Sequence, residues 1–456
     1  MKKDKDGRNP RPEGNKVSPS EITIGKPSAT TEIVNDNLPP TGEAVQEYQF
    51  PDQPSARGAR TPATIDNLKY ILDLEGISVR FNVIKKDVEI TIPGLQGTAH
   101  NVRNVAFAHI KSLCTRHGMS SDGLADYLLA VADSNPRNPV AEWITSKPWD
   151  GKDRIAAICN TITVAEGYLY HLKNILIQKW LLSAIAAIFM PQKFRSRGVL
   201  TFQGLQGIGK TSWFAQLVDE RLRHEVVQLG HSWDGGSKDA RMSATQHWIT
   251  EFGELEGSFR KEIDSLKAFI TLDFDKIRPP YARSENSYPR QTVFAATVNQ
   301  QEFLKDATGN SRFWTIAVET IDYRHDIDVQ QLWAQLKVKL DGGDVWWLNE
   351  PEESLLAHHN LRHRDFGATG AKVQAALDMS RFNEEQLPRM NPGQVLAELG
   401  YDKPTNTQYK ECAAVLREFL GEPTRSKGYP FWRVPLLVRE GNMFRPLPPN
   451  RYPDQG

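Results

Sequence analysis

The chain has 456 residues, in which 56 lysine and arginine side chains balance 56 aspartate and glutamate side chains. Its length predicts roughly two to four domains. Hydrophobic residues make up 39% of the chain and charged residues 25%, which excludes a wholly disordered protein. The zero net charge excludes a basic coat over the whole surface, so any contact with nucleic acid must come from local clusters of basic side chains.

Three cysteines, Cys114, Cys159 and Cys412, stand far apart and form no CxxC pair. This spacing indicates neither a zinc site nor a disulfide framework and is typical of a reducing compartment. The N-terminus lacks the apolar segment of a signal peptide. The longest apolar run, residues 180–190, is shorter than the roughly 20 residues of a membrane span. We therefore expect a cytoplasmic protein with no membrane partner.

Residues 1–60 are rich in proline, glycine, serine, threonine and charge, with almost no apolar periodicity. This composition predicts a disordered tail. Residues 61–160 are expected to form a small accessory domain whose composition indicates no chemistry. The expected elements of this domain are, in chain order, a helix at 68–74, a hairpin of strands 79–83 and 88–92, and helices at 103–116 and 120–133.

Residues 161–350 alternate between helical and strand patterns, which favours an α/β fold with a largely parallel sheet. A long apolar helix at about 167–190 precedes the first strand of this region. The expected strands are 198–202, 247–250, 292–297 and 313–318.

The sequence pattern of residues 370–440 predicts a separate domain of three helices and a hairpin. The expected elements are helices near 370–379, 391–399 and 405–420 and a strand at 429–434. Three helices followed by a hairpin outline a winged helix, with Trp432 in its core. Residues 441–456 are expected to form a flexible tail.

The segment 204–211 reads Gly-Leu-Gln-Gly-Ile-Gly-Lys-Thr and matches the phosphate-binding pattern GxxxxGK[ST]. It lies between a predicted strand and a predicted helix, as this loop requires, although a glycine-rich turn can match by chance. The glycines let backbone N–H groups point at phosphate oxygens, and the helix N-terminus adds a positive dipole end. We expect Lys210 to reach the β- and γ-phosphates of ATP and Thr211 to hold Mg²⁺. The expected ATP-binding residues are Gly204, Gly207, Gly209, Lys210, Thr211 and Ser212.

A carboxylate is expected on a neighbouring strand to organise Mg²⁺ and water. The strand 247–250 ends at Glu251, and Glu254 follows three residues later because Phe252 occupies the place of a second adjacent acid. We assign Glu251 to the Mg²⁺ side and Glu254 or Glu256 to the base that positions water. A charged strand end without a role is the alternative for each.

Two further polar residues are candidates for catalysis. Asn299 follows the strand 292–298, where its amide can hold the attacking water near the γ-phosphate, although turns also favour asparagine. Arg312 precedes the apolar strand 313–318. It is either a surface residue or, in a ring of ATPases, a finger that reaches the nucleotide of the neighbouring subunit.

Several motifs in a fixed order now point to one family. They are segments 149–154, 204–211, 248–255, 266–271, 278–281, 296–299 and 306–314. This series resembles the virulence-associated E family of phage- and plasmid-borne ATPases, which is related to the superfamily 3 helicases within the AAA+ group. The resemblance runs from about Asn138 to Leu348. One departure is Ser311, because the family often has an arginine there and Arg312 is then the only candidate finger.

The resemblance implies a P-loop, AAA+-like ATPase core in a ring, typically a hexamer, that couples ATP hydrolysis to movement on DNA during replication of mobile elements. No strand in 61–160 carries an Asp-x-Asp pair, so priming activity is not expected. We predict an ATP-dependent helicase or helicase-like replication motor that binds single-stranded or origin DNA, further copies of itself and replication proteins of the host. The alternatives are a DNA-stimulated ATPase switch or loader without unwinding, and a DNA-binding regulator without hydrolysis.

Basic side chains gather between Glu254 and Asn299, where superfamily 3 helicases carry the pore elements that grip single-stranded DNA. Lysine and arginine can follow phosphates while an aromatic ring stacks on bases. The expected DNA contacts of this segment are Lys267, Lys276, Arg278, Tyr281 and Arg283. The alternative is a solvated loop that packs on the core, with Asp275 among the acids that pair with these bases.

Two other polar clusters lie nearer the C-terminus. Arg425 and Lys427 flank the turn before the last predicted strand, where a wing would touch either origin DNA or a protein partner. His358, His359 and His363 have helical spacing but no carboxylate or cysteine beside them. This spacing indicates a solvated helix face rather than a metal site.

Overall fold

The computed structural model describes thirteen stretches of the chain, almost all within one compact unit, Phe50–Gly456. They are residues 49–56, 58–95, 101–234, 237–253, 265–277, 285–301, 303–304, 310–364, 366–382, 384, 386–426, 428–440 and 443–448.

The N-terminal domain packs three helices against a small sheet. Its elements are α1 (Ile65–Leu74), β1 (Ser78–Asn82), β2 (Asp87–Thr91), α2 (Val102–Arg116), α3 (Leu124–Asp133) and β3 (Pro136–Arg137). The strand order is β2-β1-β3, with β1 antiparallel to β2 and parallel to β3. Each predicted helix and strand of this domain is present.

Both predicted boundaries of this domain are wrong. Phe50 is buried in its core and meets Tyr70 edge to face, and Asp52 N–H donates to the side chain of Asn67 at 2.9 Å. The domain therefore begins near residue 50 and not near 61. A single aromatic residue in a polar stretch has no periodicity to reveal it.

At the other end, α4 (Pro139–Ile144) and α5 (Ile155–Asn160) belong to the central domain and not to the accessory one. Val140 and Ile158 are fully buried in the central core. Both helices are only six residues long, so their apolar spacing is too short to assign them to either neighbour.

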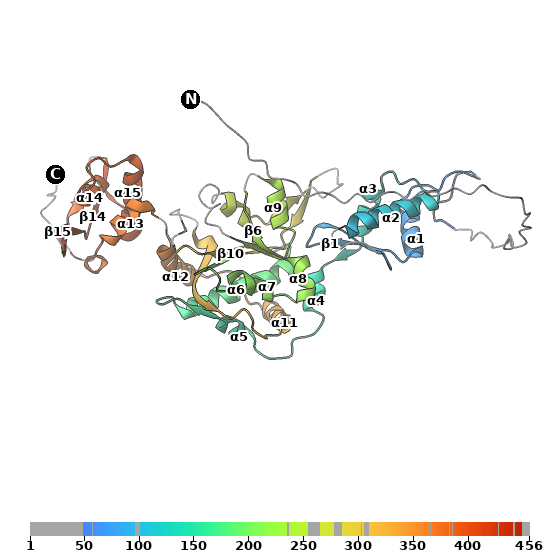
Figure 1. The fold of residues 1–456 in the computed structure, drawn as a ribbon, viewed down its shortest axis with the longest axis horizontal. Coiled ribbons are helices and arrows are strands. Elements are labelled where there is room, and N and C mark those ends of the chain that lie inside the picture. Colours follow the sequence, from blue (N-terminus) through green and yellow to red (C-terminus); the bar gives the residue numbers. More distant parts are fainter. Residues whose placement is uncertain are drawn as a thin grey trace, which may run out of the picture. The chain divides into compact units, whose positions relative to one another are not determined.

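The central domain is built on a six-stranded, mostly parallel sheet (Figure 1). Its strands are β4 (Ile162–Val164), β5 (Val199–Gln203), β6 (Val227–His231), β7 (Ile249–Phe252), β10 (Val293–Val298) and β11 (Phe313–Ile321). In the order β4-β11-β5-β10-β7-β6, only the β4–β11 pair is antiparallel. The predicted mixed α/β fold with a parallel-rich sheet is confirmed.

Alternate side chains of these strands enter two cores, one on each face of the sheet. Leu200 and Phe202 of β5 join the larger core, whereas Val199 of the same strand joins the smaller one. The larger core is covered by α6 (Tyr170–Phe189), α7 (Lys210–Gln216), α8 (Glu220–Val226) and α11 (Val329–Asp341). On the other face lies α9 (Lys238–Ala244) (Figure 1).

Helix α6 has no distinct polar face, and thirteen of its twenty residues are buried. By length and composition it is long enough to cross a membrane, but here it forms the centre of the larger core, as expected of a helix without a polar face. Trp180 on α6 donates its indole N–H to the carbonyl of Phe294 on β10 at 2.7 Å. This bond ties the helix to the middle of the sheet.

The chain continues through α12 (Glu350–Asn360) into the C-terminal domain. The elements of that domain are α13 (Gly367–Ala375), β12 (Arg389–Met390), α14 (Pro392–Glu398), α15 (Asn406–Leu420), β13 (Thr424–Ser426), β14 (Tyr429–Arg433), β15 (Leu437–Glu440) and β16 (Met443–Pro446). The sheet order is β12-β14-β13, and Trp432 is buried in the core, as predicted. Strand β16 pairs with β15, so the predicted tail at 441–456 contains a strand.

Candidate functional site

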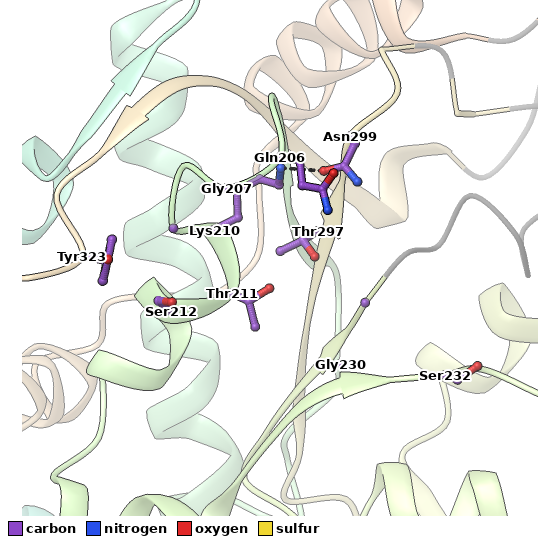
Figure 2. A pocket seen from close by; sticks show the side chains of 12 residues that line it. Gln206, Gly207, Lys210, Thr211, Ser212, Gly230, Ser232, Thr297, Asn299 and Tyr323 are labelled. Atoms are coloured by element: carbon purple, nitrogen blue, oxygen red, sulfur yellow. Dashed lines mark hydrogen bonds between the residues drawn. The ribbon is translucent and has the colours of Figure 1, made fainter.

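A cavity of about 690 Å³ lies where β5, β7 and β10 end at the same edge of the sheet (Figure 2). Carboxyl ends of parallel strands gather the loops that follow them, so ligand sites form there. The cavity is lined by Gln206, Gly207, Gly209, Lys210, Thr211, Ser212, Gly230, Ser232, Gly253, Thr297, Asn299 and Tyr323. Five of the six predicted ATP-binding residues are among them, and Gly204 begins the same loop.

The loop between β5 and α7 depends on its glycines. Gly207 and Gly209 have φ angles of 84° and 93°, in the left-handed region that other residues rarely adopt. A Cβ on Gly204 would lie 2.4 Å from the carbonyl oxygen of Val318. The loop therefore keeps its curl and its contact with β11 only with glycine at these positions.

Lys210 and Asn299 are brought together, as predicted. The Lys210 ammonium donates to the carbonyls of Gly204 and Leu205, at 2.7 Å each, and to Asn299 Oδ1 at 2.9 Å (Figure 2). Lysine 210 is buried, and these three acceptors are neutral. A buried ammonium among neutral oxygens retains a strong attraction for an anion that enters the cavity.

Glu251 and Thr211 are also brought together. Glu251 is fully buried on β7, and its Oε1 accepts hydrogen bonds from Thr211 Oγ1 at 3.2 Å and from Thr297 Oγ1 at 2.6 Å. Its Oε2 accepts from the Gly230 N–H at 2.6 Å. Both carboxylate oxygens are thus fixed at the edge of the cavity by donors that carry no charge.

The oxygen pair of Thr211 and Glu251 suits a hard divalent cation. Mg²⁺ is held in proteins by one or two carboxylates together with oxygens of the substrate and water. Across the part of the chain that the structure describes, no three His, Cys, Asp or Glu side chains cluster as metal ligands. A cation here would therefore depend on Glu251, Thr211 and oxygens brought by a bound ligand.

Thr297 and Tyr323 were not predicted as site residues. Thr297 lies on β10, two residues before Asn299, which directly follows the strand. This spacing puts both side chains on the same side of the chain, and it is a signal that the sequence carries. Tyr323 follows β11, and its ring fills the space that a Cβ on Gly209 would need. Figure 2 places it beside Ser212, across the loop from Asn299. No motif in the sequence indicates Tyr323.

Arg312 lies at the opposite edge of the sheet from this cavity. It ends a 3-10 turn (Asn310–Arg312) just before β11, and Phe313 pairs with Val199 at the start of β5. The glycine loop follows the other end of β5, about 15 Å away at the rise of a strand. Arg312 is therefore too far from the cavity of its own chain to contact a ligand there.

The turn that carries Arg312 is held by α12. The side-chain amide of Asn360 donates to the carbonyls of Asn310 and Phe313 at 3.0 Å each. The Nε of Arg312 is buried without a hydrogen-bond partner among the residues described. No motif in the sequence indicates Asn360, which lies at the end of α12.

The predicted DNA contacts divide into three groups. Lys276 on β8 (Phe274–Ile277) and Arg425 on β13 are exposed. Lys267 is buried, so its prediction as a DNA contact is wrong: the helical residues around it, Leu266 and Phe269, enter the smaller core. The remaining predicted site residues lie outside the described part of the chain, and they are Glu254, Glu256, Arg278, Tyr281, Arg283 and Lys427.

The prediction of a solvated histidine face is wrong for two of its three members. His359 is buried against the ring of Tyr168, with ring centroids 4.8 Å apart. His363 is buried and its Nδ1 lies 3.0 Å from the carbonyl oxygen of Gln301. Burial lowers the pKa of both imidazoles. These histidines join α12 and the turn after it to neighbouring segments.

The fold and the site define a mixed α/β protein with a polar cavity at the carboxyl edge of a parallel-rich sheet. Residues 144–365 match the family model of the Virulence-associated protein E-like domain. The match covers nearly half of the chain and confirms the resemblance inferred from its motifs.

Two solved structures of the NrS-1 C-terminal region are similar to the chain. The A form apo structure has a TM-score of 0.37 and 14% identity and covers 81% of this chain and 99% of that one. The A form apo structure of region 305–718 has a TM-score of 0.32 and 13% identity and covers 80% of this chain and 98% of that one. No curated protein matches the sequence.

Proposed function

We propose that the chain is a Mg²⁺-dependent ATPase with a P-loop, AAA+-like core. In this proposal it acts as a helicase or helicase-like replication motor that uses ATP hydrolysis to move on DNA. One observation carries the proposal. Lys210, Thr211 and Asn299 line a single cavity, and the buried Glu251, on a third segment, is joined to it by a hydrogen bond from Thr211. The match of residues 144–365 to the Virulence-associated protein E-like domain, the family that the motifs resemble, supports it.

The site suits a nucleoside triphosphate for electrostatic reasons. The glycine loop lines the cavity, where its backbone N–H groups would bind phosphate oxygens, and the Lys210 ammonium can exchange the carbonyls of Gly204 and Leu205 for phosphate oxygens, which bind a cation more strongly. Thr211 and Glu251 would hold Mg²⁺, which neutralises charge on the phosphates and orients them. Thr297 and the Gly230 N–H keep the Glu251 carboxylate in place for this role.

Hydrolysis also needs a positioned water. The Asn299 Oδ1 lies 2.9 Å from the Lys210 ammonium, just after β10, and this position supports a role for its amide in orienting a water beside the terminal phosphate. Such positioning lowers the activation free energy of hydrolysis, because the water is already held next to the phosphate and loses less entropy in the reaction. Arg312 would complete the site from the neighbouring subunit, since it lies at the far edge of its own sheet. We therefore include a ring, in the form of a hexamer, in the proposal.

The exposed bases Lys276 and Arg425 are the proposed contacts to single-stranded or origin DNA. Arg425 stands on β13, an edge strand of the sheet β12-β14-β13. Strands β13 and β14 follow the helices α13, α14 and α15, and this order supports a winged-helix-like domain. The three cysteines are buried and unpaired, and burial raises the pKa of each thiol. Unpaired cysteines suit the cytoplasm, where the motor would meet host replication proteins.

The test of this proposal is ATP hydrolysis by the wild-type chain beside Lys210→Ala. We expect the variant to lose about a hundredfold or more in turnover, because it lacks the cation at the developing phosphate charge, while its unfolding midpoint stays the same. Lys238→Ala, which removes a lysine whose side chain is 92% exposed, is the matched control. Full turnover by Lys210→Ala would refute the assignment of the phosphate site.

Two further measurements separate the alternatives. Strand displacement on forked duplexes supports the motor, whereas DNA-stimulated hydrolysis without displacement identifies a switch or loader. A wild-type chain that hydrolyses no ATP with or without DNA would be a regulator. If Arg312 acts between subunits, mixing Lys210→Ala with Arg312→Ala chains restores part of the activity, because some sites then receive both residues. No recovery in the mixture would contradict the shared site.

A further inference from the structure

The hairpin of β8 and β9 (Asn286–Pro289) has two chemically different faces. Along β8, Phe274 and Lys276 are exposed while Asp275 and Ile277 are buried. The strands pair in register, with Asp275 opposite Tyr288. Because side chains alternate along a strand, a slip by one residue would bury Lys276 and expose Asp275. Whatever fixes Asp275 therefore decides which face reaches solvent.

Asp275 is held first by the central domain. Its Oδ1 accepts hydrogen bonds from Arg290 Nε at 3.0 Å and Nη2 at 2.6 Å. Arg290 is fully buried, and it also donates to the carbonyl of Phe269 at 2.6 Å. Its backbone N–H donates to the Asp273 carbonyl at the base of the hairpin. Arg290, a base of the predicted DNA segment, is thus a structural residue.

The second partner of Asp275 comes from the N-terminal domain. Lys86, in the turn between β1 and β2, is fully buried with its Nζ 3.6 Å from Asp275 Oδ2, and it donates to the carbonyl of Thr245. Its φ angle is 55°, the only positive φ of a non-glycine residue among the residues described. A left-handed lysine costs backbone energy, so the fold accepts strain to place this side chain.

The strand before this turn makes further contacts with the hairpin and the central domain. The ring of Phe81 on β1 stacks on Tyr288 of β9, with centroids 6.0 Å apart and planes 16° apart. The Asn82 side chain donates to Glu225 on α8 at 2.7 Å. The N-terminal domain therefore contacts both strands of the hairpin: Lys86 contacts β8, and Phe81 contacts β9.

A buried group of two cations and one anion is a poor way to gain stability, because desolvation offsets most of the attraction. Buried charges of this kind are best known for selecting one register or pairing over another. Because Asp275 and Lys276 alternate on β8, this charged group can select the register that buries Asp275 and exposes Lys276. The group lies between two domains, so the N-terminal domain contributes to the selection of this register.

We propose that Lys86 is a positioning residue: by holding Asp275, the N-terminal domain fixes the face of the β8–β9 hairpin that presents Lys276 to nucleic acid. The ligand in this inference rests on the proposed function, whereas the anchoring of the hairpin does not. The role of the N-terminal domain is then to set how the motor contacts DNA.

The test compares Lys86→Met with Lys85→Met in the full chain. Lys86→Met keeps the side-chain volume and leaves Asp275 paired with Arg290, and the Thr245 carbonyl still accepts from Thr292 Oγ1 at 3.2 Å, so we expect it to fold. Hydrogen exchange at residues 274–277 and 286–289 should become about tenfold faster, since a charge-assisted contact is lost. Lys85→Met removes the neighbouring charge without touching Asp275 and should leave exchange unchanged.

The second readout is the DNA dependence of ATP hydrolysis. In Lys86→Met the DNA concentration for half-maximal stimulation should rise about tenfold for the same lost contact, with DNA-free turnover unchanged. Unchanged exchange in the hairpin overturns the anchor. If hydrogen exchange in the hairpin is faster but the DNA concentration for half-maximal stimulation is unchanged, the proposed link between Lys86 and DNA binding is overturned. If the wild-type chain hydrolyses no ATP, the proposed function fails, and exchange together with binding of a labelled single-stranded oligonucleotide still decides this inference.

Discussion

Two buried carboxylates on neighbouring parts of the molecule serve different ends. Glu251 on β7 is held by two hydroxyls and a backbone N–H, all neutral donors. Asp275 on β8 lies between the cations of Arg290 and Lys86. The first carboxylate keeps its charge available for a ligand at the edge of a cavity, whereas the charge of the second is already matched by the protein. The difference separates a binding site from a structural anchor.

The largest expected effect on stability is at the anchor. Asp275→Asn would leave Lys86 and Arg290 buried without an anion, and breaking a buried pair in this way costs about 3–5 kcal/mol. Denaturant unfolding of the variant measures this loss. The control is Asp273→Asn, which removes a partly exposed carboxylate paired with Arg195 and should cost under about 1 kcal/mol. Equal losses in the two variants would remove the distinction between the carboxylates.

A smaller effect is expected at the support of Glu251. Thr297→Val removes one of the two hydroxyls that hold Oε1, so we expect ATP turnover to fall about tenfold and the Mg²⁺ requirement to rise, as for one lost hydrogen bond to a charged group. Thr315→Val on β11 is the matched control, because the Thr315 hydroxyl is buried without a partner among the residues described. A Thr297→Val enzyme with normal turnover and Mg²⁺ requirement would show that the hydroxyl does not position the carboxylate.

The smallest effect concerns pH and Lys86. Burial lowers the pKa of Lys86 to about 8 from 10.5, against the opposing pull of Asp275. Above pH 8 the unfolded chain binds a proton on this lysine that the folded chain does not, so stability rises with pH through this group. Relative to Lys86→Met, the free energy of unfolding of the wild type should increase by about 1 kcal/mol between pH 8 and 9. A difference that falls or stays constant over this range would contradict the buried position of the ammonium.

Most of the candidate site was predictable because its principal polar residues carry local signals. Lys210, Glu251 and Asn299 each follow or end a strand, and parallel strands end at one edge, so their convergence follows from the topology. Thr297 carries a weaker signal, through its two-residue spacing from Asn299. Tyr323 carries none, because only the packing of its loop against Gly209 brings it to the cavity.

The anchor could not be predicted for a different reason. Lys86 lies in a turn beside another lysine, where the sequence indicates a solvated residue, and nothing local reports that the turn is buried under another domain. Lys267 was misread in the same way, because charge alone does not report burial. In the hairpin, the alternative that acids pair with bases is confirmed for Arg290 and Asp275. Tertiary contacts decide whether these side chains are buried, and such contacts leave no periodic pattern in the sequence.

The measurement that tests the central claim most directly is Mg²⁺-dependent ATP hydrolysis by Glu251→Gln, read together with its unfolding free energy. Glutamine keeps the size of the side chain and removes its charge, so we expect turnover to fall about a hundredfold to a thousandfold. Stability should change by no more than about 2 kcal/mol, because only the bond from Gly230 is lost. A Glu251→Gln chain that unfolds like Asp275→Asn, or one that hydrolyses ATP at the wild-type rate, would contradict the assignment of Glu251 to the catalytic site.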